Sequence, residues 1–151
     1  MTIHKSAAAQ SGLMPDFGVP AGITLSRSAS FSPSGSTTVV SGDTIQMIPI
    51  PKNAKLLSLA INYPDIADSN NADVGDGGDP DRFMADVKMS GANTKMFPGS
   101  GFDNTAGFLK VYNTDDTIDI AIDKGTTAMN SSQTIEMFVS YMMVGTINDE
   151  G

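Results

Sequence analysis

The densest group of side chains that could carry chemistry is the acidic loop of residues 73–81, Asp-Val-Gly-Asp-Gly-Gly-Asp-Pro-Asp. Calcium prefers several carboxylate and carbonyl oxygens on a flexible loop that contains glycine, so this segment is a candidate calcium site. An EF-hand loop needs oxygen ligands at alternate positions and a Glu at the twelfth, but Gly75 and Gly77 hold the alternate positions and Met84 is twelfth. The spacing therefore predicts a tight, solvated turn with no metal.

Catalytic residues are also few. The chain has no Cys and one His, His4, which excludes thiol nucleophiles, thiolate zinc sites and disulfides. A catalytic triad or a two-His metal motif would have to rest on this residue close to the N-terminus. Only two Glu occur, Glu136 and Glu150, and the chain contains neither a Gly-x-Ser-x-Gly elbow nor a Walker loop. We expect no catalytic residue, no cofactor and no enzymatic activity.

The charge balance restricts the partners. The chain of 151 residues has the length of one domain, and 17 acidic against 9 basic residues give it a net charge of −8. A surface of this sign repels phosphate backbones, and the basic residues do not cluster, so we expect neither a nucleic-acid partner nor a membrane partner. Residues 1–22 are too polar for a secretory signal, so we expect the protein to work where it is made or in an assembly built there.

The elements that position these residues are strands, because apolar and polar residues alternate with period two from Asp43 onward. Residues 117–123, 57–63 and 135–144 show this pattern clearly, and residues 44–50 and 108–112 show it weakly. Short strands separated by Gly, Asn and Asp turns predict an all-β antiparallel sandwich, with a jelly roll as the favoured variety.

Residues 82–87 fit two kinds of element. Asp79-Pro80-Asp81 has the residue types of a helix start, because Asp favours the N-cap and Pro favours the first helical position. Phe83 and Val87 also belong to an alternating pattern, which would make the segment a strand.

Residues 1–42 are rich in Ser, Ala, Gly and Thr, and their apolar residues are isolated. We predict an extended N-terminal arm over 1–42, a sandwich over 43–147 and a C-terminal tail over 148–151. The arm is either a terminus without a role or an element that docks on a partner, since such a segment buries enough surface only when a neighbour supplies it. The candidate anchors for docking on a partner are Leu13, Met14, Phe17, Ile23, Leu25 and Phe31.

The last strand needs cover on both faces, because both carry apolar residues. It is either central in a sandwich or half exposed to a partner subunit. For the second case we predict a homo-oligomer, a trimer or a dimer, with Phe138, Met142 and Val144 at its interface.

Four segments in order carry a resemblance: residues 41–57, residues 73–84, residues 114–120 and the closing strand through Tyr141. Their order and spacing, over about residues 41–145, resemble those of a family of small virion proteins of tailed bacteriophages, of the capsid decoration (cement) protein type. The resemblance implies a homo-oligomeric sandwich, often a jelly roll, that is made in the bacterial cytoplasm, sits on the outer capsid surface and stabilises contacts between major capsid proteins.

Two alternatives to the decoration role stay open at this point. A head-fibre or tail-associated protein would use the same sandwich to bind a host glycan. A carbohydrate-binding module is the alternative outside viruses, but the chain has no Trp and only three Tyr to stack on sugar rings.

Overall fold

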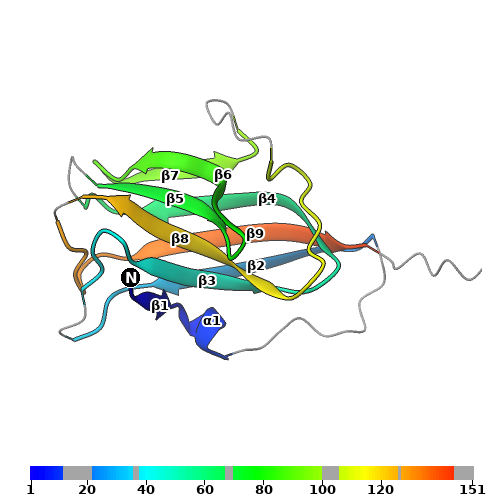
Figure 1. The fold of residues 1–151 in the computed structure, drawn as a ribbon, viewed down its shortest axis with the longest axis horizontal. Helices are drawn as coiled ribbons and strands as arrows, with labels where there is room; N and C mark the ends of the chain where they lie inside the picture. The colour runs from blue at the N-terminus through cyan, green and yellow to red at the C-terminus, as the bar shows by residue number, and fades with distance from the viewer. Residues whose placement is uncertain (12–21, 36–37, 67–69, 100–105, 126, 145–151) are drawn as a thin grey trace, which may run out of the picture.

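The structure, a computed structural model, describes residues 1–11, 22–35, 38–66, 70–99, 106–125 and 127–144 (Figure 1). No helix in these ranges is long and apolar enough to cross a membrane. The elements are β1 (Ile3–Lys5), α1 (Ala7–Ser11), β2 (Thr24–Phe31), β3 (Thr44–Ile50), β4 (Ala54–Tyr63), β5 (Asn71–Asp76), β6 (Asp79–Lys88), β7 (Asn93–Phe97), β8 (Asp116–Lys124) and β9 (Ile135–Met143).

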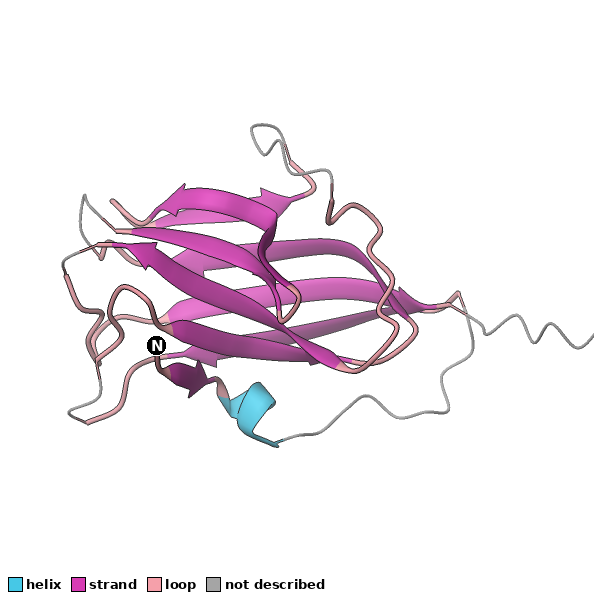
Figure 2. Ribbon diagram, viewed as in Figure 1, coloured by secondary structure: helices cyan, strands magenta, loops and turns pink. Residues whose placement is uncertain are grey.

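The strands form two sheets that pack face to face, with α1 at one side (Figures 1 and 2). The five-stranded sheet has the order β1-β3-β8-β5-β6, and the four-stranded sheet has the order β2-β9-β4-β7. Neighbouring strands are antiparallel, except for the short parallel pair of β1 and β3. The predicted all-β antiparallel sandwich is confirmed.

The core lies between the sheets and follows from the period-two pattern. Ile118, Ile120 and Ile122 of β8 are buried and belong to the same cluster as Val139 and Tyr141 of β9. Full burial of an aliphatic side chain of this size contributes about 1.5–3 kcal/mol. The alternation along β8 and β9 therefore supplies much of the free energy that holds the two sheets together.

The segment after the acidic loop is a strand. β6 pairs with β5 through an antiparallel hairpin, in which Asp76 lies opposite Asp79. The helix over residues 82–87 is therefore wrong and the strand is right, because Phe83 and Val87 are buried in the core and this burial outweighs the local helix-start signal at Asp79. The predicted strand over residues 108–112 is also wrong, since only an isolated bridge between Val111 and Lys55 forms there.

The N-terminal segment differs most from the prediction. β2 pairs with β9 along its whole length, from Thr24 opposite Met142 to Phe31 opposite Ile135, and β1 pairs with the start of β3. A boundary at residue 42 therefore does not separate an arm from the sandwich. The period-two signal is present in β2 but weak, because small Ser residues alternate with Leu25, Arg27 and Ala29.

Candidate functional site

The candidate site is the outer face of the four-stranded sheet, where β9 is the second strand. Side chains alternate between the two faces of a strand, so the odd-numbered residues of β9 fill the core, while Glu136 and Phe138 point outward. Phe138 keeps 44% of its surface exposed. The sheet thus presents a large aromatic ring on its outer face.

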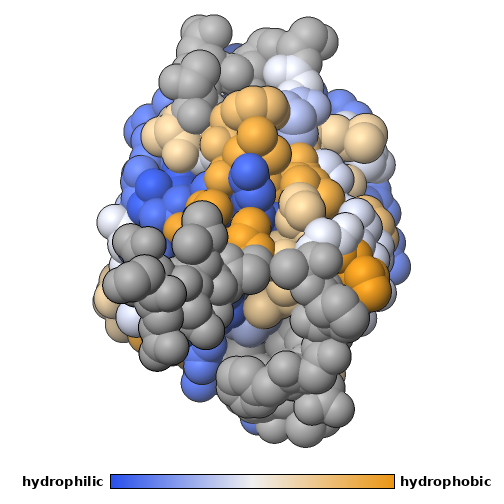
Figure 3. Space-filling model, turned by 90° about the vertical axis from the view of Figure 1, so that its right-hand side faces the viewer, coloured by the Kyte–Doolittle hydropathy of each residue, from blue (hydrophilic) through white to orange (hydrophobic). Residues whose placement is uncertain are grey.

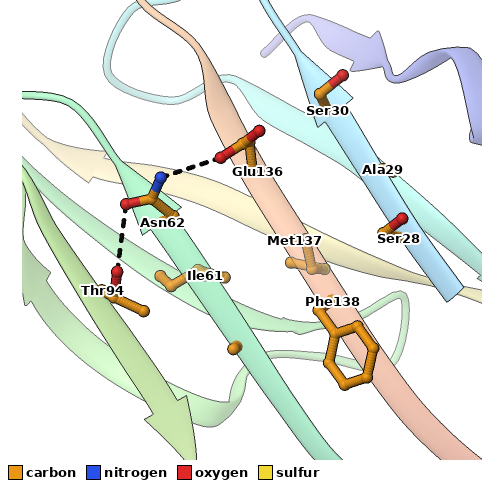
Figure 4. A pocket seen from close by; sticks show the side chains of 10 residues that line it. Ser28, Ala29, Ser30, Ile61, Asn62, Thr94, Glu136, Met137 and Phe138 are labelled. Atoms are coloured by element: carbon orange, nitrogen blue, oxygen red, sulfur yellow. Dashed lines mark hydrogen bonds between the residues drawn. The ribbon is translucent and has the colours of Figure 1, made fainter. Parts of the chain in front are cut away.

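A shallow groove of about 470 Å³ lies on this face beside Phe138 (Figure 4). The strand register explains its shape, because Phe138 lies opposite Ser28 of β2 and Ala60 of β4. Small side chains on both sides leave the ring standing above its neighbours. A ridge next to a hollow is a form that can pack against a complementary protein surface.

Polar groups from three neighbouring strands line one side of the groove (Figure 4). Asn62 of β4 donates from Nδ2 to Glu136 Oε2 of β9 at 3.0 Å. Thr94 of β7 donates from Oγ1 to Asn62 Oδ1 at 3.2 Å. An apolar centre with a hydrogen-bonding rim is the composition of a protein-binding surface.

The three predicted interface residues lie on β9 or directly after it. Met142 follows Phe138 on the outer face of β9, and Val144 lies directly after the strand, where its backbone N–H donates to the carbonyl oxygen of Asn53 at 2.9 Å. Both are half-buried, so Phe138 is the residue of the three that offers the most free surface. Their role at a subunit interface stays a prediction.

The predicted docking residues do not form one group. Leu13, Met14 and Phe17 lie outside the described residues. Ile23 is 47% exposed and lies directly before β2. Leu25 packs against the core and Phe31 is part of it, so both stabilise the sandwich itself.

The acidic segment 73–81 contains the end of β5, the exposed turn at Gly77 and Gly78, and the start of β6. Asp76 is buried and accepts hydrogen bonds from Gly78 N at 3.0 Å and from Arg82 Nε at 2.6 Å. Arg82 also approaches Asp79 at 3.6 Å. A guanidinium of the chain thus lies among these carboxylates, and within the described ranges no three metal-ligating side chains come together.

The single histidine has a structural contact. His4 Nε2 lies 3.1 Å from Asp43 Oδ2, and Asp43 also accepts from the backbone N–H groups of Thr2 and Val40. Burial raises the pKa of Asp43, but the hydrogen bonds from Val40, Thr2 and His4 outweigh this effect and hold the pKa below its usual value. This contact fastens β1 to the start of β3.

Sequence reasoning did not single out Asp119. It lies on the polar side of the alternation in β8, yet it is only 7% exposed, and its Oδ1 has no hydrogen-bond partner in the described structure. Burial raises the pKa of Asp119 to about 7, and nearby Asp116 and Asp76 act in the same direction. The alternating pattern predicts a solvent-exposed side chain at this position. The sequence of one strand does not show which neighbouring segments cover its outer face.

Comparison with known proteins gives a shared fold. No protein-family model matches the chain, and no curated protein matches its sequence. Three chains of solved structures match in fold. A chain of the capsid of Ralstonia phage GP4 superposes with a TM-score of 0.72 at 15% identity, covering 95% of this chain and 99% of that one.

The other two matches are weaker and also come from phage capsids. A chain of the capsid asymmetric unit of cyanophage Pam1 has a TM-score of 0.57 at 20% identity, over 87% of this chain and 92% of that one. A chain of the capsid of Helicobacter pylori bacteriophage KHP30 has a TM-score of 0.52 at 9% identity, over 83% of this chain and 92% of that one. The sandwich of this protein is thus a fold that also occurs in the capsids of three phages.

Proposed function

We propose that this protein is a structural component of a bacteriophage virion, a decoration protein that binds the outer capsid surface and stabilises contacts between major capsid proteins. The observation that carries the proposal is the match to the chain of the Ralstonia phage GP4 capsid, which spans almost the whole length of both chains. The shared fold covers 95% of this chain and 99% of that one, so the likeness includes nearly all of the sandwich and not a few strands of it.

The strand order supports the same proposal. We infer a jelly roll, because strands β2 to β9 divide into the sheets β2-β9-β4-β7 and β3-β8-β5-β6, to which β1 adds an edge. In a jelly roll eight antiparallel strands form two packed sheets, and the fold is common among viral capsid domains.

A decoration role requires binding surfaces and not reacting groups. A protein that binds the assembled lattice more tightly than separate capsid subunits stabilises the shell by mass action. Weak contacts repeated over a symmetric lattice give strong retention when an oligomer engages two or more sites at once. The groove beside Phe138 supports the oligomer, a dimer or a trimer, because it offers an exposed aromatic ring among small side chains.

Localisation on the virion tests the proposal. Antibody against this protein, bound to virions of the phage that encodes it and viewed by electron microscopy, should label the outer surface of the head. Labelling at the tail or at head fibres would overturn the decoration role. Virions that lack the protein altogether would overturn the virion role as well.

A further inference from the structure

One end of the sandwich carries an apolar surface that the groove does not include. Figure 3 views this end, and hydrophobic residues gather near its centre. The structure brings together there the start of β2, the turn between β3 and β4, and the segment before β8. We call this surface the end patch. Its exposed apolar members are Ile23, Phe108, Leu109 and Val111.

Backbone hydrogen bonds join these segments into one continuous surface. Gly22 N donates to Met143 O at 3.0 Å, which places Ile23 beside the end of β9. Val144 N in turn donates to Asn53 O at 2.9 Å. The turn that contains Asn53 is bonded to the segment 110–112, because Asn53 N donates to Tyr112 O and Leu56 N donates to Lys110 O. The patch therefore rests on the rigid strands of both sheets.

The backbone at Leu109 is held in an unfavourable conformation. Its φ is +54°, in the left-handed region that residues other than Gly, Asn and Asp rarely adopt. Leu109 is also 37% exposed, and Phe108 before it is 58% exposed. A leucine that keeps more than a third of its surface exposed while its backbone is strained stabilises the fold less than a fully buried leucine in a relaxed conformation. Such an arrangement fits a residue whose side chain is used in a contact with another molecule.

Lysines surround the apolar residues, in a chain whose net charge is −8. Lys52 lies in the turn between β3 and β4, Lys55 is near the start of β4, and Lys110 lies between Leu109 and Val111. None of them forms an ion pair in the described structure. The nearby Asp115 keeps its negative charge, and its Oδ1 accepts from the backbone N–H of Lys52 at 2.8 Å. The end patch is thus apolar and bordered by three lysines and the carboxylate of Asp115.

The apolar residues and lysines of the end patch favour some binding partners over others. Two copies that met through this patch would place lysines against lysines, which disfavours a symmetric self-contact. Anionic membranes and nucleic acids are disfavoured by the negative charge of the remaining surface. The C-terminal residues 145–151 carry Asp149 and Glu150, but they have a single large apolar residue, Ile147, to set against four.

We propose that the end patch is the surface by which this protein docks on the shell, and that its partner is an apolar protein surface bordered by Asp or Glu carboxylates. This inference rests on the proposed function. Phe108 and Leu109 enter the apolar centre of the contact, and Lys52, Lys55 and Lys110 pair with the carboxylates around it.

Binding to shells tests this proposal. The probe is shells of the encoding phage from which this protein has been stripped, and the measurement is bound protein after sedimentation, as a function of concentration. Phe108→Ser and Lys110→Glu should each weaken binding about tenfold or more. Leu109→Gly should weaken it as well with a small change in melting temperature, because the strain that Gly relieves at a positive φ offsets the loss of the partly buried side chain. That variant separates docking from folding.

Matched controls lie at the other end of the sandwich. Val40→Ser and Lys88→Glu change an exposed apolar residue and an exposed lysine there, and both should bind shells like the unmutated protein. Equal binding by all five variants would overturn the end patch and leave the proposed function intact. Failure of the unmutated protein to bind shells would overturn both.

Two further outcomes identify a different occupant. A chain that ends at Val144 and binds shells about tenfold more tightly than the full chain would show that the tail covers the patch, and would overturn its docking role in the full chain. Vesicles of phosphatidylcholine and phosphatidylserine that bind the unmutated protein and not Lys110→Glu, together with unchanged shell binding by that variant, would make the patch a lipid-binding surface and overturn the proposal.

Discussion

Asp119 is a buried carboxylic acid whose Oδ1 has no hydrogen-bond partner in the described structure. In the sheet it lies opposite Gln46 of β3 and Gly75 of β5, and a hydrogen bond from the Thr117 side chain is its favourable polar contact. The backbone of Asp79 and Pro80 closes over Gly75, which helps to explain why water is excluded nearby. A buried carboxyl in this setting is more stable with its proton on.

Stability should therefore depend on pH through Asp119. Its pKa is about 7 when folded against 3.8 in the exposed state, so the folded chain binds this proton more tightly. The free energy of unfolding then falls as pH rises from about 4 to 7. Asp119→Asn should remove this slope and raise the free energy of unfolding at pH 8 by about 2 kcal/mol. Urea unfolding at pH 5 and pH 8 measures both, and parallel pH profiles for the two proteins would contradict the assignment.

Gly75 of β5 lies where the backbone of β6 packs closely against β5. A Cβ at this position would overlap the carbonyl oxygen of Asp79 and lie 2.5 Å from the carbonyl oxygen of Pro80. Gly75→Ala should lower the free energy of unfolding by about 1–3 kcal/mol, since backbone atoms cannot move aside cheaply. Gly78→Ala is the control, because its Cβ would meet its nearest atoms at 3.5 Å. Equal losses for the two variants, measured by chemical denaturation, would show that close packing is not the cause.

At the scale of elements, the strands with strong alternation could be predicted and those without it could not. Residues 117–123 and 135–144 place bulky apolar side chains on alternate positions, so their burial follows from the sequence. β2 alternates Ser with Leu25, Ala29 and Phe31, a pattern whose apolar face is too small to stand out. β2 becomes a strand because β9 offers an unpaired edge, and such long-range pairing leaves little trace in local sequence.

The candidate site was predictable only in part for the same reason. Phe138 stands out because it interrupts the polar face of a strong strand. The groove beside it requires Ser28 and Ala60 as neighbours, and that register depends on three strands far apart in the sequence. The end patch likewise joins segments that only the folded chain brings together.

Truncation distinguishes a separate arm from an integral strand. A chain that starts at residue 41 lacks β2 and with it Phe31, and it leaves one edge of β9 unpaired, so we expect it not to fold. A chain that starts at residue 22 lacks only β1 and α1 of the described elements, and it should keep a cooperative thermal transition at a lower melting temperature. Circular dichroism as a function of temperature measures unfolding of both chains. A cooperative transition in the chain that starts at residue 41 would show that the residues before it form an arm independent of the sandwich.

For the whole molecule, charge and shape together determine how copies associate. The net charge of −8 makes copies repel one another at long range, so self-association needs an apolar contact strong enough to overcome it. We expect the outer face of the four-stranded sheet to supply this contact at Phe138, where Asn62, Thr94 and Glu136 form a polar rim along one side of the groove. Raising the salt concentration screens the repulsion and should favour the oligomer.

Phe138→Asp should therefore release folded monomers. The substitution places an added negative charge in the middle of the contact and removes its aromatic centre, so the dissociation constant should rise at least about tenfold. Ile3→Asp is the control, because Ile3 is 53% exposed on β1 of the other sheet. Light scattering at tens of micromolar measures the mass, and circular dichroism checks the fold. An unmutated protein that is monomeric under these conditions, or an oligomer that persists in Phe138→Asp, would move the self-contact away from this face.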